Sequence, residues 1–132
     1  MSGRMLGVSD SANCQDTINY QYLAALVTQG IFTANRISRI VDIRGVPQVA
    51  GTDGSAVTLS FYKCASGTAP ASGVLLHAGT YNMKGTIYTQ QVLTLVANLD
   101  TLTMNPGDTV AYVLTGTATA AIGCISITIE PV

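Results

Sequence analysis

The segment ISITIE, from Ile125 to Glu130, alternates apolar and polar side chains with a period of two. In an extended strand this places the three isoleucines on one face and Ser126, Thr128 and Glu130 on the other. The pattern is typical of an antiparallel strand with one face on a core and one in water. The alternation therefore indicates a β-strand. The uncharged stretch Thr109–Ile129, which contains most of this segment, is long enough for a membrane helix, but its alternating pattern argues against one.

The same alternation recurs along the chain. In Val57–Lys63 the apolar residues share one face, and the turn signal Gly51–Ser55 precedes them. In Ile37–Val46 the pattern is imperfect because Ile40 falls opposite the other apolar residues, as a bulge or a second covered face would explain. Leu23–Gln29 is consistent with a short helical turn. Strands are expected at Thr17–Tyr22, Arg36–Val46, Val57–Lys63, Val74–Ala78, Gly85–Tyr88, Gln91–Ala97, Thr109–Thr115 and Gly123–Ile129.

Clusters of Gly, Pro, Ser and Ala, such as Ala65–Gly73, separate these strands. About eight short strands with turn signals between them predict an all-β, single-domain jelly roll or β-sandwich. We assign it to residues 17–132. Residues 1–16 are small and polar, have no apolar signal-peptide core, and are expected to form a flexible N-terminal arm.

The composition points to a protein whose surface is covered by other protein. Apolar residues make up 48% of the 132 residues and charged residues 10%, against about 25% charged in typical soluble domains. Six Lys and Arg against seven Asp and Glu give no basic surface for nucleic acid. The local group of Arg36, Arg39 and Arg44, with Asp42 among them, suits salt bridges at an interface. We expect neither a nucleic-acid nor a membrane partner.

The cysteine pattern argues against a metal site and a disulfide framework. There are three cysteines, an odd number, with no C-x-x-C spacing. We expect free thiols in a protein made in a reducing cytosol. The three are Cys14, Cys64 and Cys124.

Candidate catalytic and metal-binding residues are few. His77 is the single histidine, no G-x-S-x-G motif accompanies it, and it is expected at a turn or an interface. Asp53 and Asp108 follow turn patterns, Asp-Gly and Pro-Gly-Asp, and lack nearby carboxylates for calcium. The sequence therefore predicts no enzyme, metal or cofactor.

Tyrosines offer one alternative function. Carbohydrate-binding sandwiches stack sugars on exposed aromatic side chains, and Tyr81, Tyr88 and Tyr112 would suit such a platform. Tyrosines are also common at strand ends and subunit interfaces. A receptor- or carbohydrate-binding β-sandwich of a phage fibre or other surface appendage is therefore the alternative hypothesis.

An ordered set of segments carries a family resemblance. The set begins with Asn19–Tyr22 and continues through the following segments in order: Ala50–Leu59, Ala65–Gly73, Tyr81–Thr86, Leu102–Asp108, and Leu114–Thr117 leading into the strand from Ile125 to Val132. In this order the chain resembles small structural proteins of tailed bacteriophages, most of all the jelly-roll capsid decoration (cement) proteins. The resemblance covers nearly the whole chain from Thr17 onward.

The resemblance implies an architectural role without catalysis. Such proteins are made in the host bacterial cytoplasm and bind the outer surface of the phage head, where they bridge capsomers of the major capsid protein. They act as oligomers, here a homodimer or a homotrimer. The candidate contacts with the capsid or between subunits are the arm residues, the arginines and two tyrosines: Arg4, Met5, Leu6, Tyr20, Tyr22, Arg36, Arg39 and Arg44.

Overall fold

The computed structural model describes residues 15–23 and 28–132. Its long strands are β1 (Asp16–Tyr22), β2 (Gln29–Thr33), β3 (Ser38–Val49), β4 (Thr58–Cys64), β11 (Thr109–Thr115) and β12 (Ile122–Pro131). The short strands are β5 (Val74–Leu75), β6 (His77–Ala78), β7 (Tyr81–Asn82), β8 (Gln91–Val92), β9 (Thr94–Leu95) and β10 (Thr103–Met104). One helical turn, α1 (Leu99–Leu102), and a 3-10 turn at Pro70–Ser72 complete the described elements.

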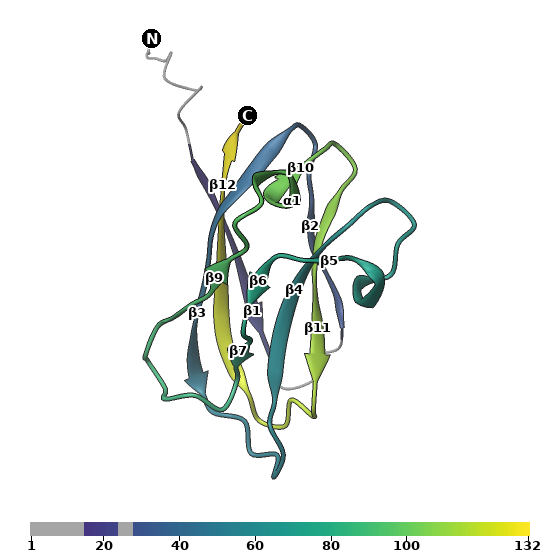
Figure 1. Cartoon of the computed structure of the whole chain (residues 1–132). Coiled ribbons are helices and arrows are strands. Elements are labelled where there is room, and N and C mark those ends of the chain that lie inside the picture. Colours follow the sequence, from purple (N-terminus) through teal and green to yellow (C-terminus); the bar gives the residue numbers. More distant parts are fainter. Residues whose placement is uncertain (1–14, 24–27) are drawn as a thin grey trace.

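The strands pair in a nested order. β1 pairs with β12, β2 with β11, β3 with β10 and β4 with β5, all antiparallel. This nesting produces two five-stranded sheets, β1-β12-β3-β10 with β8 beside β3, and β2-β11-β4-β5 with β7 beside β4. A separate two-stranded sheet joins β6 and β9. Figure 1 shows the two five-stranded sheets as two layers. This arrangement confirms the predicted all-β jelly-roll sandwich.

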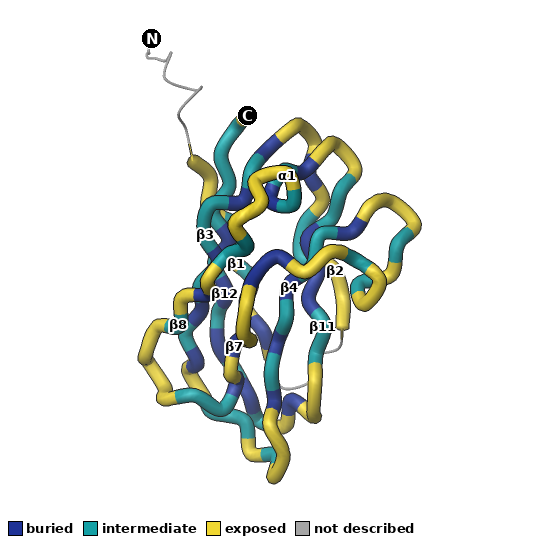
Figure 2. Tube along the Cα trace, in the orientation of Figure 1, coloured by how far each residue is buried: buried dark blue, intermediate teal, exposed yellow. Residues whose placement is uncertain are grey.

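The core lies between the two sheets, where the alternating segments meet. Ile125 and Ile127 of β12 are buried, as are Leu59 and Phe61 of β4. Figure 2 shows buried and less buried positions alternating along the long strands. The predicted inward faces of both strands are therefore confirmed.

A bulge explains the irregular pattern of β3. Ile129 lies opposite Ile40 and Thr128 lies opposite Asp42, so Val41 between them has no partner of its own. The extra residue lets both Ile40 and Ile43 point into the core, although they are an odd number of residues apart. The bulge interpretation is confirmed.

Two local predictions were wrong. Gly85–Tyr88, expected as a strand, forms turns, and Tyr88 has a positive φ of 60°. Gln29, expected in a helical turn, begins strand β2, whereas residues 24–27 of that prediction lie outside the described residues. β2 forms because β11 offers it an open edge to pair with, a tertiary condition that the local pattern does not contain.

Candidate interaction surfaces

Tyr22 and Tyr81 join the two sheets from inside the core. Tyr22 lies on β1 and Tyr81 on β7, which pairs with β4 of the other sheet. Their hydroxyls are 2.8 Å apart, and both side chains are fully buried. Burial raises the pKa of the Tyr81 phenol above its ordinary value, so the pair stays protonated and shares one hydrogen bond.

A second tyrosine pair lies further along β1. The hydroxyl of Tyr20 is 2.9 Å from that of Tyr112 on β11 and accepts a 2.6 Å hydrogen bond from Nε2 of Gln29. Tyr20 is only partly exposed and Tyr112 is buried. Burial raises the pKa of Tyr112 as well.

These positions correct two predictions about tyrosines. Tyr22 is buried and cannot be a contact residue for another protein, and most of Tyr20 is committed to Tyr112 and Gln29. The proposed sugar platform is also wrong, because of its three members only Tyr88, at 76% exposure, reaches solvent. The alternating pattern of β1 places Tyr20 and Tyr22 on the face of the strand that is turned toward the core, and the structure shows both side chains there.

A double-mutant cycle on Tyr22 and Tyr81 tests the buried hydroxyl pair. Either Tyr22→Phe or Tyr81→Phe leaves one buried hydroxyl without a partner, so we expect each to lower the free energy of unfolding by about 1–2 kcal/mol. The double variant removes both polar groups and should cost little more than one single variant, a coupling of about 1 kcal/mol. Urea titrations measure all three. Strict additivity would contradict the shared hydrogen bond.

His77 is a buried structural residue, which corrects its expected place at a turn or an interface. After β5 the chain leaves β4 to form β6, and the amide N–H of Phe61 then donates to His77 Nε2 at 2.9 Å. The imidazole is fully buried, and burial lowers its pKa. The ring is therefore neutral and carries its proton on Nδ1, which lies 3.1 Å from the carbonyl oxygen of Ala78. Its Nε2 accepts the hydrogen bond that a backbone carbonyl would otherwise accept from β4.

The turn from Asn105 to Asp108 is structural. Asp108 accepts a 2.9 Å hydrogen bond from the amide of Asn105, and Gly107 has a φ of +95°. Asp53 accepts from the amide of Thr117 at 3.1 Å. Asp108 thus stabilises its own turn, as its pattern predicted, whereas Asp53 joins its loop to a distant segment of the chain. Within the described ranges, no three His, Cys, Asp or Glu residues lie close enough together to hold a metal ion.

One outer face of the sandwich carries no charge among the described residues. We call it the uncharged face; it consists of outward side chains of β2, β4 and β11. In the register, Gly30, Ala111 and Tyr62 form one row, and Val113 lies opposite Ser60 in the next. Thr33 and Thr109 form a third row, with their hydroxyls 2.9 Å apart.

A groove of about 420 Å³ lies at one end of the uncharged face. Its floor is Gly30, Ala111 and Cys64, and the loop from Ala65 to Pro70 forms one wall. This loop, with its single helical turn, projects beside β4 in Figure 1. The lining has neither a charged side chain nor a large apolar one, so it suits contact with a protein surface better than capture of a charged small molecule.

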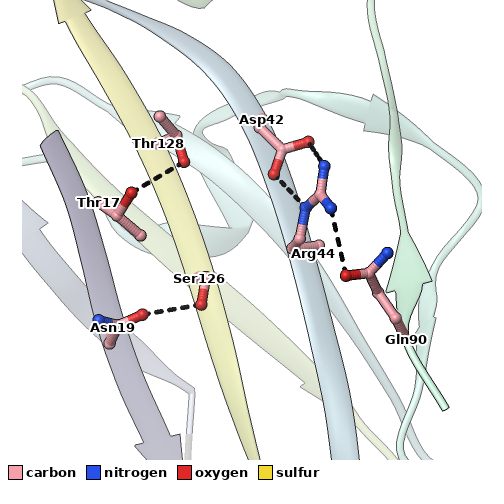
Figure 3. Close-up of polar contacts among 7 residues, drawn as sticks. All are labelled: Thr17, Asn19, Asp42, Arg44, Gln90, Ser126 and Thr128. Carbon is pink, nitrogen blue, oxygen red and sulfur yellow. Dashed lines mark hydrogen bonds and ion pairs between the residues drawn. The ribbon is translucent and has the colours of Figure 1, made fainter. Parts of the chain in front are cut away.

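The opposite outer face, on β1, β12 and β3, is polar and hydrogen-bonded within itself (Figure 3). Ser126 donates to Asn19 at 2.8 Å, and Arg44 holds Asp42 through Nε and a terminal nitrogen at 2.5 and 2.8 Å. Arg44 also donates to Gln90 at 3.2 Å. We call this the polar face; its side chains already satisfy much of one another's hydrogen-bonding capacity.

The three predicted arginines do not form one stripe. Arg39 and Arg44 lie on the polar face, where Arg39 is opposite Glu130 in the register. Arg36 lies in the bend after β2 and faces Asp16 at 3.7 Å. Arg36 is thus separated from the two arginines on the polar face. Each of the three lies near an acidic residue of this chain.

The remaining predicted residues are either separated or outside the described ranges. Cys64 lies in β4 and Cys124 in β12, on different sheets, so they do not pair with each other. Burial raises the pKa of the Cys64 thiol, which keeps it protonated. Arg4, Met5, Leu6 and Cys14 lie outside the described residues, as does nearly all of the predicted arm.

Comparison with solved structures gives a structural likeness to a viral protein. A chain in the structure of the Gx strain of infectious bursal disease virus is similar to 91% of this chain at 16% identity, with a TM-score of 0.39. This chain spans 30% of that one. No family model and no curated protein matches the sequence. In the described part of the chain, no helix has the length and apolar character needed to cross a membrane.

Proposed function

We propose that this chain is a structural, non-catalytic virion protein that decorates the outer surface of a bacteriophage head and stabilises the shell. The observation that carries the proposal is the contrast between the two sheet faces. The uncharged face offers neutral, mostly small side chains and a shallow groove, whereas the polar face satisfies much of its own hydrogen-bonding capacity, with Nε of Arg39 as an exception. A decoration protein needs one surface that packs on protein and another that remains in water.

The physical chemistry of the uncharged face supports packing against protein. Burying Gly, Ala, Thr, Ser and Val side chains requires no desolvation of a charge, which would cost several kcal/mol for each ion. Low side-chain entropy at these positions further reduces the cost of association. In this proposal the groove beside the Ala65–Pro70 loop receives a protruding segment of the major capsid protein.

Stabilisation follows from selective binding to the assembled lattice. A protein that binds the shell but not its free subunits shifts the assembly equilibrium toward the shell by mass action. If copies are joined as dimers or trimers, two or three weak contacts act together through their high effective concentration. This mechanism needs no reacting group, in keeping with the structural roles of His77, Asp53 and Asp108.

Co-sedimentation with undecorated heads tests the proposal. Val113→Lys places a charge in the centre of the uncharged face without entering the core, and we expect it to weaken head binding by at least about tenfold, which corresponds to about 1.4 kcal/mol. Gln21→Lys adds the same charge to the exposed edge of the polar face and should bind as the unmodified protein does. Both variants should keep the same melting temperature.

The outcomes separate this proposal from the alternative. An unmodified protein that stays in the supernatant with heads at all salt concentrations contradicts the decoration role. Equal weakening by both substitutions contradicts the assignment of the uncharged face. Binding to a glycan array that is lost in Tyr88→Ala, the best exposed tyrosine among the described residues, would favour the receptor-binding alternative instead.

A further inference from the structure

Both five-stranded sheets end on the same side of the sandwich in long strands whose outer edges pair with none of the described residues. Within the described structure, β1 is the terminal strand of one sheet and β2 that of the other. They are seven and five residues long. On the opposite side, the terminal strands β10 and β5 have only two residues each. Short edge strands limit unwanted pairing, so that side is protected and the β1–β2 side is not.

The sequences of β1 and β2 also lack the usual protection of an edge. They contain no Lys and no Pro, and Asp16, at the start of β1, is their single charged residue. Natural edge strands of this length usually carry charges, prolines or covering segments, because exposed backbone groups recruit other strands. A covering segment is therefore expected on this side.

A groove of about 400 Å³ lies between the two edges. Ile18, Phe32 and Ile129 line it and remain partly exposed, although they border the core. The Asp16–Arg36 ion pair stands at its rim at 3.7 Å, with the two side chains 66% and 58% exposed. The groove therefore combines an apolar floor, available backbone edges and, at its rim, a carboxylate that is paired with Arg36 and still exposed to solvent. Such a site fits an extended peptide with apolar side chains next to a positive charge.

The N-terminal sequence of the protein has this composition. Arg4 precedes Met5 and Leu6, and no proline occurs before β1. Some ten residues join Leu6 to Asp16, a reach of up to about 33 Å when extended. Because Asp16 itself lines the groove, a segment that filled the groove of its own chain would have to reverse direction within these ten residues. The same segment reaches the groove of an adjacent copy without such a reversal.

We propose that the β1–β2 groove of one copy binds residues 1–14 of a second copy, with Met5 and Leu6 on the apolar floor and Arg4 near Asp16. The contact is reciprocal in a dimer and cyclic in a trimer. It links copies of this chain to one another, and it is independent of what the uncharged face binds.

Disulfide trapping between two variants tests this exchange. In a background of Cys14→Ser, Cys64→Ala and Cys124→Ser, one chain carries Gly7→Cys and the other Asn35→Cys, beside the groove. After mixing and mild oxidation, we expect a cross-linked heterodimer on a non-reducing gel. Pairing Gly7→Cys with Ser55→Cys, which lies in a loop outside the groove lining, is the control and should give less than a tenth of that yield.

Substitutions in the segment establish specificity. Adding Met5→Asp and Leu6→Asp to the Gly7→Cys chain should abolish the cross-link, whereas adding Ser2→Asp and Ser9→Asp, with the same charge, should leave it. A cross-link only within a chain that carries both cysteines would overturn the proposal, because the segment would then occupy its own groove. Absence of any cross-link, or an oligomer that persists by light scattering after removal of residues 1–12, would overturn it as well.

Discussion

Replacing Gly123 with Ala should lower the free energy of unfolding by about 3 kcal/mol, from addition of a single methyl group. Gly123 is buried in β12 beside the ring of Tyr22. A Cβ at this position would lie 2.5 Å from Tyr22 Cζ, 2.6 Å from the carbonyl oxygen of Val46 and in contact with the Tyr22 hydroxyl. Tyr22 cannot move aside, because its hydroxyl is bonded to Tyr81 across the core.

Thermal unfolding measures this effect. A loss of about 3 kcal/mol corresponds to a melting temperature lower by roughly 10 °C for a domain of this size. Gly54→Ala is the matched control, since no atom lies within 4 Å of a Cβ built there, and it should change stability by less than about 0.5 kcal/mol. Equal stability of Gly123→Ala and the unmodified protein would show that β12 and Tyr22 separate more readily than their packing implies.

Replacing His77 with Ala should cost about 3 kcal/mol or more. The change leaves the buried amide of Phe61 without an acceptor, which alone costs about 1–3 kcal/mol. It also opens a cavity where the imidazole packs against Phe61, at a ring separation of 5.7 Å. His77→Gln places an amide oxygen near the same amide and should recover part of the loss. If His77→Ala and His77→Gln unfold at the same denaturant concentration, the hydrogen bond contributes nothing.

His77 should also make the stability of the folded protein sensitive to acid. Burial holds the pKa of His77 in the folded protein below its ordinary value of 6.5. Below pH 6.5 the unfolded chain therefore binds a proton that the folded chain does not, so stability falls as the pH decreases toward the folded pKa. The slope is at most about 1.4 kcal/mol per pH unit for this one group. Stability curves of the unmodified protein and His77→Gln should diverge in this range; parallel curves would contradict the assignment.

Local alternation was enough to predict five of the six long strands, the exception being β2. In β12 and β4 the apolar residues recur every second position, and only one face of a sandwich strand can be buried, so the pattern fixes which face is inward. The irregular β3 pattern predicted a bulge for the same reason, because Ile40 and Ile43 both had to reach the core. Gln91–Ala97, predicted as one strand, contains β8 and β9, which pair with different partners. No local pattern specifies such a division.

The candidate surfaces were less predictable than the strands. The alternation of Ala111 and Val113 with larger apolar residues already indicated a second, uncharged side of β11. That this side joins Gly30 and Tyr62 in one uncharged row depends on the register with β2 and β4. Arg36 and Arg39 are close in sequence but have different neighbours, because Arg36 lies in a bend and faces Asp16, whereas Arg39 lies in β3 opposite Glu130.

The sequence by itself determined that this protein is a β-sandwich, which positions face its core, and that Asp108 stabilises its own turn. These properties depend on a period of two and on turn residues, which act over a few neighbouring positions. Only the tertiary structure decided that Tyr22 meets Tyr81, that His77 takes the place of a departing strand, and that β1 and β2 lie at neighbouring sheet edges with a groove between them. Each of these contacts joins residues from different strands, and only the nested pairing of strands brings them together.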